Sequence, residues 1–205
     1  MDTHLAYIES GAEVITTNTF SSRRIRMDQN KVSRYFEYAN KKACELAIQA
    51  KQNSKKEVFI AGSIPAQFDT YKEDTRDDEI ISSAFFDQIN CISDYVDFLY
   101  LDVISSGREI DLATKIIEKL DKPILLGIHL TKNGCLPSGE TISQVLKKYK
   151  SKNWIGIIAA CVSLEIAENS INELQLQNLP FGYKVNLWGQ DCLLYTSDAA
   201  DDSRS

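Results

Sequence analysis

The stretch Gly11-Ala-Glu-Val-Ile-Thr-Thr-Asn-Thr-Phe20 begins with a glycine, continues through β-branched residues and ends in polar side chains. This order is typical of a buried strand that delivers polar groups at its carboxyl end. Short apolar runs of the same kind recur along the chain. Because most are apolar at nearly every position, they predict parallel strands that are covered on both faces. The predicted strands are 13–17, 57–61, 98–103, 123–129, 154–160 and 181–185.

Longer amphipathic stretches separate these strands and predict helices. The predicted helices are 32–51, 77–95, 106–120, 141–150 and 163–176. In the first, apolar residues recur at helical spacing, so one face of that helix is expected to pack on a sheet. Thr141 and Ser163 are suitable helix starts, although neither is expected to form a full capping box. Repeated βα units are compatible with an open doubly wound sheet or a closed eight-stranded barrel, and periodicity alone does not separate the two.

The composition of the 205-residue chain, with 43% hydrophobic and 25% charged residues, predicts a soluble globular protein with one domain. Its formal net charge of −6 argues against nucleic acid or a membrane as partner, because both attract clusters of Lys and Arg. No apolar run approaches the roughly 20 residues that cross a bilayer, and no signal-peptide pattern opens the chain. We therefore expect a cytoplasmic protein. Wide separation favours reduced thiols for the five cysteines, which are Cys44, Cys91, Cys135, Cys161 and Cys192.

The residues after Asp191 have a different character. The segment Cys192-Leu-Leu-Tyr-Thr-Ser-Asp-Ala-Ala-Asp-Asp resembles the in-frame translation of a transposon adapter used in sequencing libraries. We therefore expect a barrel domain over residues 1–191 and a non-native tail over residues 192–205. On this interpretation the natural protein continues beyond about residue 191.

Polar and reactive groups follow most of the predicted strands. Both candidate architectures bind their ligands beyond the carboxyl ends of parallel strands, so these groups are expected to gather on one rim. In chain order, the strand ends deliver Thr17, Ser63, Asp102, His129 and Cys161.

Several of these stretches, taken in order, resemble the homocysteine S-methyltransferase family. The opening stretch, preceded by His4-Leu-Ala-Tyr7, resembles the second βα unit of that family. The other matching segments are Ala61-Gly-Ser-Ile64, Leu99-Tyr-Leu-Asp-Val-Ile104, Gly134-Cys-Leu-Pro-Ser-Gly-Glu140 and Ile155-Gly-Ile-Ile-Ala-Ala-Cys161. The sequence departs from the family at Asp102 and Val103, where Glu-Thr is usual, and at Ala160, which replaces an asparagine. The resemblance implies an α/β fold, a partial (β/α)8 TIM barrel with about strands 2 to 7 present.

The resemblance also implies an activity, the transfer of a methyl group to the zinc-bound thiolate of homocysteine, giving methionine. Zn²⁺ held by cysteine thiolates keeps one position open for the substrate sulfur and favours its deprotonation. Carried over position by position, Cys161 is a zinc ligand, Asp102 holds the substrate amino group, and Thr17 contacts homocysteine. The methyl donor is a sulfonium, an ammonium or a folate compound.

The family's other zinc ligands come from a Gly-Gly-Cys-Cys segment near the end of the barrel, which this sequence does not contain. Three protein ligands are usual for catalytic zinc, so we expect the chain as given to be inactive. A barrel without its first and last strands also exposes two unpaired edges, and we expect such a fragment to aggregate or stay partly unfolded.

Two other functions remain open. A relative that has lost methyl transfer and serves as a binding or structural protein is suggested by the departures at Asp102, Val103 and Ala160. A Schiff-base aldolase is the second, because Lys132 and Lys184 lie near strand ends. The aldolase hypothesis requires a buried lysine and gives no role to a thiol at the rim.

Several residues have simpler interpretations beside the functional ones. Without the resemblance, Cys161 is most simply a small buried apolar residue. His129 is a candidate acid, base or ligand, but a hydrogen-bonded rim histidine is the simpler interpretation. His4 is interpreted as a structural or capping group before the first helix. The basic cluster of Arg23, Arg24 and Arg26 is predicted to be a solvated loop over the barrel mouth. These three arginines and His4 are therefore given no catalytic role.

Overall fold

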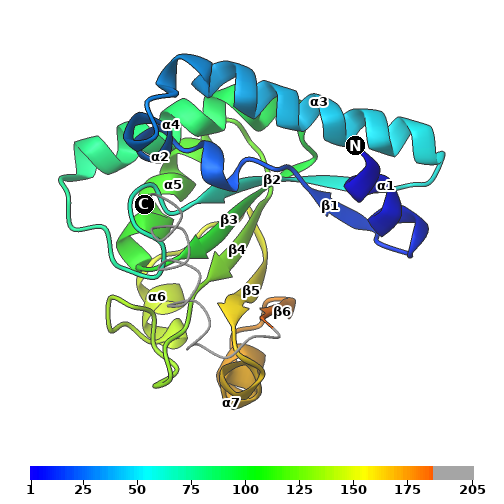
Figure 1. Cartoon of the computed structure of the whole chain (residues 1–205). Helices are drawn as coiled ribbons and strands as arrows, with labels where there is room; N and C mark the ends of the chain where they lie inside the picture. The colour runs from blue at the N-terminus through cyan, green and yellow to red at the C-terminus, as the bar shows by residue number, and fades with distance from the viewer. Residues whose placement is uncertain (187–205) are drawn as a thin grey trace, which may run out of the picture.

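The structure is a computed structural model and describes residues 1–186. Six parallel strands form one sheet in the order β1-β2-β3-β4-β5-β6. The sheet curls into a half-barrel with helices on its outer face (Figure 1). The strands are β1 (Val14–Thr16), β2 (Phe59–Pro65), β3 (Phe98–Ile104), β4 (Ile124–Ile128), β5 (Trp154–Val162) and β6 (Phe181–Val185). The predicted fold class, an α/β partial TIM barrel, is confirmed.

Seven α-helices accompany these strands in the described part of the chain. They are α1 (Asp2–Glu9), α2 (Arg24–Gln29), α3 (Phe36–Ser54), α4 (Asp78–Ile92), α5 (Gly107–Glu118), α6 (Ile142–Lys148) and α7 (Leu164–Gln175). Short 3-10 turns lie at Phe20–Ser22, Ser33–Tyr35 and Ser93–Tyr95. The sequence analysis missed α1 and α2, because each is short and buries a single residue. His4 lies inside α1 rather than before the first helix, so that prediction was wrong.

Side-chain caps begin three of the helices. Thr141 accepts from the backbone N–H of Gln144, whose side chain accepts from the N–H of Thr141 in return. This is a complete capping box, so the expectation of a partial one was wrong. Ser163 at the start of α7 and Ser106 at the start of α5 each accept from the backbone N–H three residues on. Satisfying these otherwise free donors fixes where each helix starts behind its strand.

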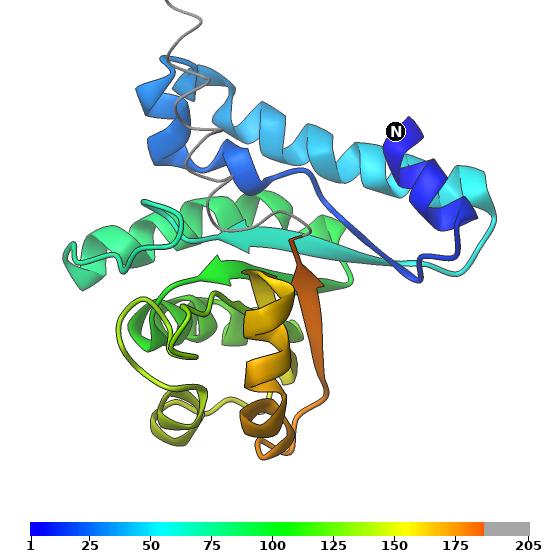
Figure 2. The ribbon, with the colours of Figure 1, turned by 60° about the horizontal axis from the view of Figure 1, so that its bottom comes forward.

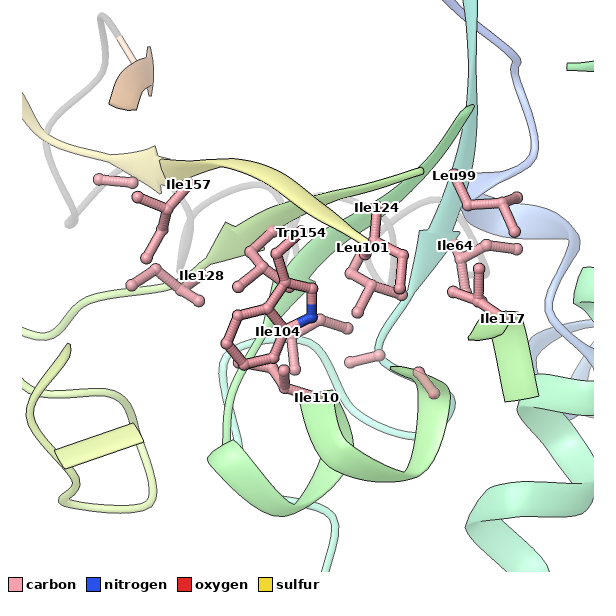
Figure 3. Close-up of a cluster of buried hydrophobic side chains, with 14 of the residues drawn as sticks. Ile64, Leu99, Leu101, Ile104, Ile110, Ile117, Ile124, Ile128, Trp154 and Ile157 are labelled. Atoms are coloured by element: carbon pink, nitrogen blue, oxygen red, sulfur yellow. The ribbon is translucent and has the colours of Figure 1, made fainter. Parts of the chain in front are cut away.

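The main core lies between the outer face of the sheet and the helices, and Figure 3 shows part of it between β3, β4, β5 and α5. Every residue of β3 is buried, as expected for a strand that is covered on both faces. Trp154 closes the lower end of this core and donates its ring N–H to the hydroxyl of Thr114 at 3.1 Å. A smaller cluster of Ala61, Phe98 and Tyr100 packs on the inner face, toward the barrel interior. The carboxyl ends of the strands therefore stand on a rigid base.

Strands β1 and β6 are the two ends of the sheet, and within residues 1–186 no further strand pairs with their outer edges. Figure 2 shows α1 beside the end of α3 and β6 next to α7. Val14 on β1 and Phe181 and Tyr183 on β6 are exposed large apolar side chains. The expected exposure of two edges is thus found for these residues, and aggregation in solution stays a prediction. No helix among the described residues has the length and apolar character that a membrane span requires.

Arg23 contradicts the prediction that the basic cluster is a solvated loop. Its side chain is buried and donates to the carbonyl oxygen of Ala66 at 3.1 Å and to the hydroxyl of Thr70 at 3.1 Å. Burial lowers the pKa of the guanidinium. Arg24 lies in α2 and pairs with Asp87 on α4 at 2.8 Å. Arg23 therefore fastens the segment after β1 to the segment after β2, whereas Arg24 and Arg26 are exposed as expected.

Candidate site at the carboxyl ends of the strands

The carboxyl ends of β3 and β5 each contain an irregularity in the strand pairing. The register shifts between Leu101 and Ile104 on β3 and between Ala160 and Val162 on β5. Within these bulges Val103 has φ 62° and Cys161 has φ 59°, a left-handed conformation that is strained for a β-branched residue such as valine. Bulges redirect the neighbouring side chains and occur often beside active sites. The two bulges lie at Asp102 on β3 and Cys161 on β5, the residues to which the family resemblance assigns roles on these strands.

Asp102 is a buried carboxylate that three strands surround. It is 2% exposed, and its Oδ2 accepts from the hydroxyl of Ser63 on β2 at 3.0 Å. The ammonium of Lys184 on β6 donates to both carboxylate oxygens, at 2.8 and 3.0 Å. A buried charge is tolerated when it is paired and hydrogen-bonded, and these contacts supply both conditions. The Asp102 carboxylate is therefore held in one position across the barrel interior.

Cys161 lies at the same rim and is half-buried. Its sulfur is 3.0 Å from the hydroxyl of Tyr71 and accepts from the amide of Asn186 at 3.1 Å. Burial raises the pKa of Tyr71, and the hydrogen bond to Cys161 and the negative charge of Asp102 raise it further. The same phenol thus contacts the sulfur and lies within electrostatic reach of the carboxylate. Cys161 is accordingly directed toward the mouth and not into the outer layer of helices.

His129 contacts Tyr71 and the end of β5. Its ring packs against that of Tyr71 at a tilt of 53°, with 4.5 Å between centroids, and its Nδ1 is 3.3 Å from the carbonyl oxygen of Ala160. Burial lowers the pKa of His129, which favours the neutral ring. The observed contacts are those of the hydrogen-bonded rim histidine rather than of a metal ligand or an acid facing solvent.

Thr17 lies at the end of β1, and its hydroxyl is largely engaged. The Oγ1 atom accepts from the backbone N–H of Ser63 at 3.0 Å and lies 2.9 Å from the hydroxyl of Thr19, which itself donates to the carbonyl oxygen of Ser63 at 2.6 Å. These bonds use the proton of Thr17 and one of its two lone pairs. One acceptor position remains free for a ligand.

A groove of about 970 Å³ leads to part of this site. It runs along the free edge of β1, between α1 and α3, and reaches Thr17, Asp102 and Lys184, whereas Cys161 and Tyr71 are not among its lining residues. Its volume lies in the range of small-molecule sites. The groove therefore connects the edge of β1 to the ion pair of Asp102 and Lys184.

A zinc ion requires more donors than this mouth contains. Within residues 1–186 no group of three or more His, Cys, Asp and Glu side chains is arranged to hold a metal ion. Cys161 is the one thiol at the rim among them, while Cys44 is buried in the core and Cys135 lies in the loop before α6. Since a catalytic zinc site usually takes three protein ligands, the described residues do not form one by themselves.

The two candidate lysines do not meet the requirement of a Schiff-base aldolase. Lys132 is exposed, and Lys184 is about half exposed with its ammonium committed to Asp102. Neither is the buried lysine that a Schiff-base aldolase requires.

Sequence reasoning missed Tyr71 and Asn186 as partners of the rim sulfur. Tyr71 has φ 67° and lies in the irregular segment after β2, where no periodic pattern marks which side chain turns inward. Asn186 follows β6 directly, and its place after a strand was a usable signal. The pairing of Lys184 with Asp102 joins residues far apart in sequence and becomes visible only once the strand order is known.

Glu109 is a buried carboxyl at the start of α5, outside the groove. Ser106 donates to its Oε2 at 2.7 Å, and its Oε1 has no hydrogen-bond partner among the described residues. Burial raises its pKa from an ordinary 4.5 to about 7. The folded chain therefore binds this proton more tightly than the unfolded chain, and stability falls as pH rises from 4.5 to about 7.

We predict that Glu109→Gln removes this pH dependence, because glutamine keeps the size and cannot ionise. Above about pH 7 the variant should be more stable by about 3 kcal/mol, the equivalent of the pKa shift. Below pH 4.5 Glu109 is protonated in both states, so the ionisation contributes no difference there. Urea unfolding at pH 4 and pH 8 measures both values. If the free energy of unfolding changed between pH 4 and pH 8 by the same amount in wild type and in Glu109→Gln, the prediction would be wrong.

The fold and site together define a barrel-type α/β protein with a groove and converging polar side chains at the carboxyl ends of its strands. The chain belongs to the homocysteine S-methyltransferase family, since the family model described as homocysteine S-methyltransferase matches residues 1–196. The chain is therefore a member of a family whose named activity is methyl transfer to homocysteine.

Solved structures with a similar fold include homocysteine methyltransferase MmuM from Escherichia coli. Its metallated form gives a TM-score of 0.74 at 15% identity, covering 91% of this chain and 79% of that one. Its oxidized form gives 0.72 at 15% identity, covering 100% of this chain and 83% of that one. Likeness at this level of identity supports the fold alone. A search of curated protein sequences finds no match.

Proposed function

We propose that the mouth of this half-barrel binds homocysteine, with the substrate ammonium on Asp102, its sulfur toward Cys161, and Thr17 as a further contact. The observation that carries the proposal is that the end of β6 contacts both residues, because Lys184 pairs with the Asp102 carboxylate at 2.8 Å and Asn186 donates to the Cys161 sulfur at 3.1 Å. A thiol ligand and an ammonium anchor thus lie on one rim, beside a groove of about 970 Å³. Family membership supplies the substrate class.

The reaction that we propose for the complete enzyme is transfer of a methyl group to homocysteine, giving methionine. Zinc, when bound, would deprotonate the substrate thiol and hold it for attack on the donor methyl group. Cys161 is the ligand that the described residues provide, and we infer that the others lie outside them. On this proposal the chain as given binds homocysteine and does not turn it over. A non-catalytic relative is the alternative, which the departures from the family pattern at Asp102, Val103 and Ala160 favour.

The test uses the product of the uninterrupted gene. It should retain about one zinc ion per chain, as expected for one catalytic site, and form methionine from homocysteine with one of the sulfonium, ammonium or folate donors. Cys161→Ser should lower zinc affinity and activity by more than the roughly 10–100-fold that loss of an outer-shell partner costs. Metal analysis and a methionine assay measure both.

Cys135→Ser is the matched control, because Cys135 is a free thiol in the loop after β4 and should leave zinc content and activity unchanged. Full zinc content and full activity in Cys161→Ser would remove Cys161 from the proposed site. Absence of zinc and of methyl transfer in the uninterrupted protein, with homocysteine still bound, would favour the non-catalytic relative.

A further inference from the structure

Lys184 is a cation at the mouth to which the family pattern gave no role. Its ammonium pairs with both oxygens of Asp102, at 2.8 and 3.0 Å, and lies 5.5 Å from the centre of the Tyr100 ring. The Lys184 side chain is 49% exposed, whereas that of Asp102 is 3% exposed. The carboxylate is therefore fixed and the lysine can move, because its four-carbon stem rotates freely toward the groove.

Tyr100 borders the same ion pair. It is 4% exposed, and the Lys184 ammonium lies 5.5 Å from the centre of its ring. Burial raises the pKa of Tyr100, and the charge of Asp102 and a hydrogen bond to its carboxylate raise it further, so the phenol keeps its proton. The phenol is therefore a neighbour of Asp102 as well as of Lys184.

We propose that Lys184 binds the carboxylate of the substrate, so that Asp102 and Lys184 together recognise the zwitterionic head of an α-amino acid. The inference rests on the proposed function, since it takes the ammonium of homocysteine to lie on Asp102. In the free protein the two residues neutralise each other. When the substrate enters, its ammonium replaces that of Lys184, which turns to the substrate carboxylate.

This exchange makes the pair selective. A zwitterion gives both Asp102 and Lys184 a new partner, and no buried charge is left alone. A thiol amine without a carboxylate displaces the half-exposed Lys184 from Asp102 into water and gains no charged contact from it. A thiol acid without an amine has to draw Lys184 away from a buried carboxylate that then lacks its counter-ion. The ligand that leaves every charge paired is the amino acid.

The test compares three thiols by titration calorimetry under reducing conditions. They are L-homocysteine, 3-aminopropanethiol, which lacks the carboxylate, and 4-mercaptobutanoate, which lacks the ammonium. The wild-type chain should bind homocysteine roughly tenfold to a hundredfold more tightly than either analogue, the effect of one charge-assisted hydrogen bond. Lys184→Met should weaken homocysteine binding by the same factor. It should bind 3-aminopropanethiol at least as tightly as wild type, because the rival for Asp102 is gone.

Lys184→Arg should keep homocysteine affinity within about tenfold of wild type, since it retains the cation, and it serves if the Met variant is poorly folded. Lys132→Met changes the same charge on an exposed lysine beyond β4 and should bind all three thiols as wild type does. Equal or tighter homocysteine binding by Lys184→Met would overturn the proposal and make Lys184 a competitor of the substrate. Equal loss in Lys132→Met would assign the effect to net charge.

The two proposals fail in different ways. Wild-type binding of homocysteine and 3-aminopropanethiol with equal affinity would overturn the role of Lys184 and leave the proposed function standing. Absence of binding for all three thiols would overturn both.

Discussion

Asp102→Asn should weaken homocysteine binding by about a hundredfold. The substitution removes the negative charge that pairs with the substrate ammonium, and loss of a buried charge-assisted contact costs about 3 kcal/mol. The fold should persist, because the Asn oxygen can still accept from Ser63 at the position where Asp102 accepts now. The released ammonium of Lys184 is half exposed and can turn to water. Titration calorimetry with L-homocysteine gives the affinity, and thermal unfolding verifies the fold.

Asp102→Glu is the informative companion variant, because it restores the residue that the family usually has. It keeps the charge and extends the carboxylate by one methylene, so homocysteine should bind within about tenfold of wild type, well short of the loss of a charged contact. The control ligand is 4-mercaptobutanoate, which has no ammonium to pair with Asp102. Its affinity should therefore not fall in Asp102→Asn, whereas a general distortion of the site would weaken both ligands. If Asp102→Asn bound homocysteine as well as wild type does, the carboxylate would have no part in substrate recognition.

The strands could be predicted from the sequence because their signals are local, whereas the choice of a barrel over an open sheet depended on the family resemblance. Apolar runs such as 98–103 and 154–160 are long enough to mark parallel strands, and the observed β3 and β5 begin at the same residues. The strand ends are less certain, because bulges extend both strands past the predicted limits. A bulge depends on contacts with the neighbouring strand and leaves no periodic trace in its own sequence.

The site could be predicted only in part, because several of its contacts join residues that are far apart in the sequence. Asp102 and Cys161 follow apolar strands, so their place at the rim could be read from the chain. Their partners come from other elements, with Lys184 on β6 and Tyr71 in the irregular segment after β2. Arg23 shows the same limit, since it looked like a solvated charge and is buried against the segment after β2. A charged side chain and its distant acceptor are invisible until the topology brings them together.

Gly127→Ala should be the most destabilising Gly→Ala substitution within residues 1–186. Gly127 is on β4, facing the barrel interior, where an added Cβ would lie 2.6 Å from the carbonyl oxygen of Leu101 and 2.5 Å from the ring of Tyr100. The carbonyl belongs to the backbone of β3 and cannot give way without breaking the pairing of the two central strands. Overpacking of this kind costs about 3 kcal/mol or more, a large share of the stability of a single domain.

Gly182→Ala is the matched control, because it adds the same methyl to β6 at a position where the nearest atom is 3.9 Å away, on Ile158. It should be neutral or stabilise the fold by about 0.4–1 kcal/mol, since alanine reduces the freedom of the unfolded chain. Urea unfolding gives both differences on one scale. The Tyr100 ring must also leave its position in Gly127→Ala, so the ring that borders the Lys184 ammonium moves and homocysteine binding should fall with stability. Equal unfolding midpoints for the two variants would mean that β3 and β4 are not packed as described, and the position of Asp102 at the end of β3 would then lose its structural basis.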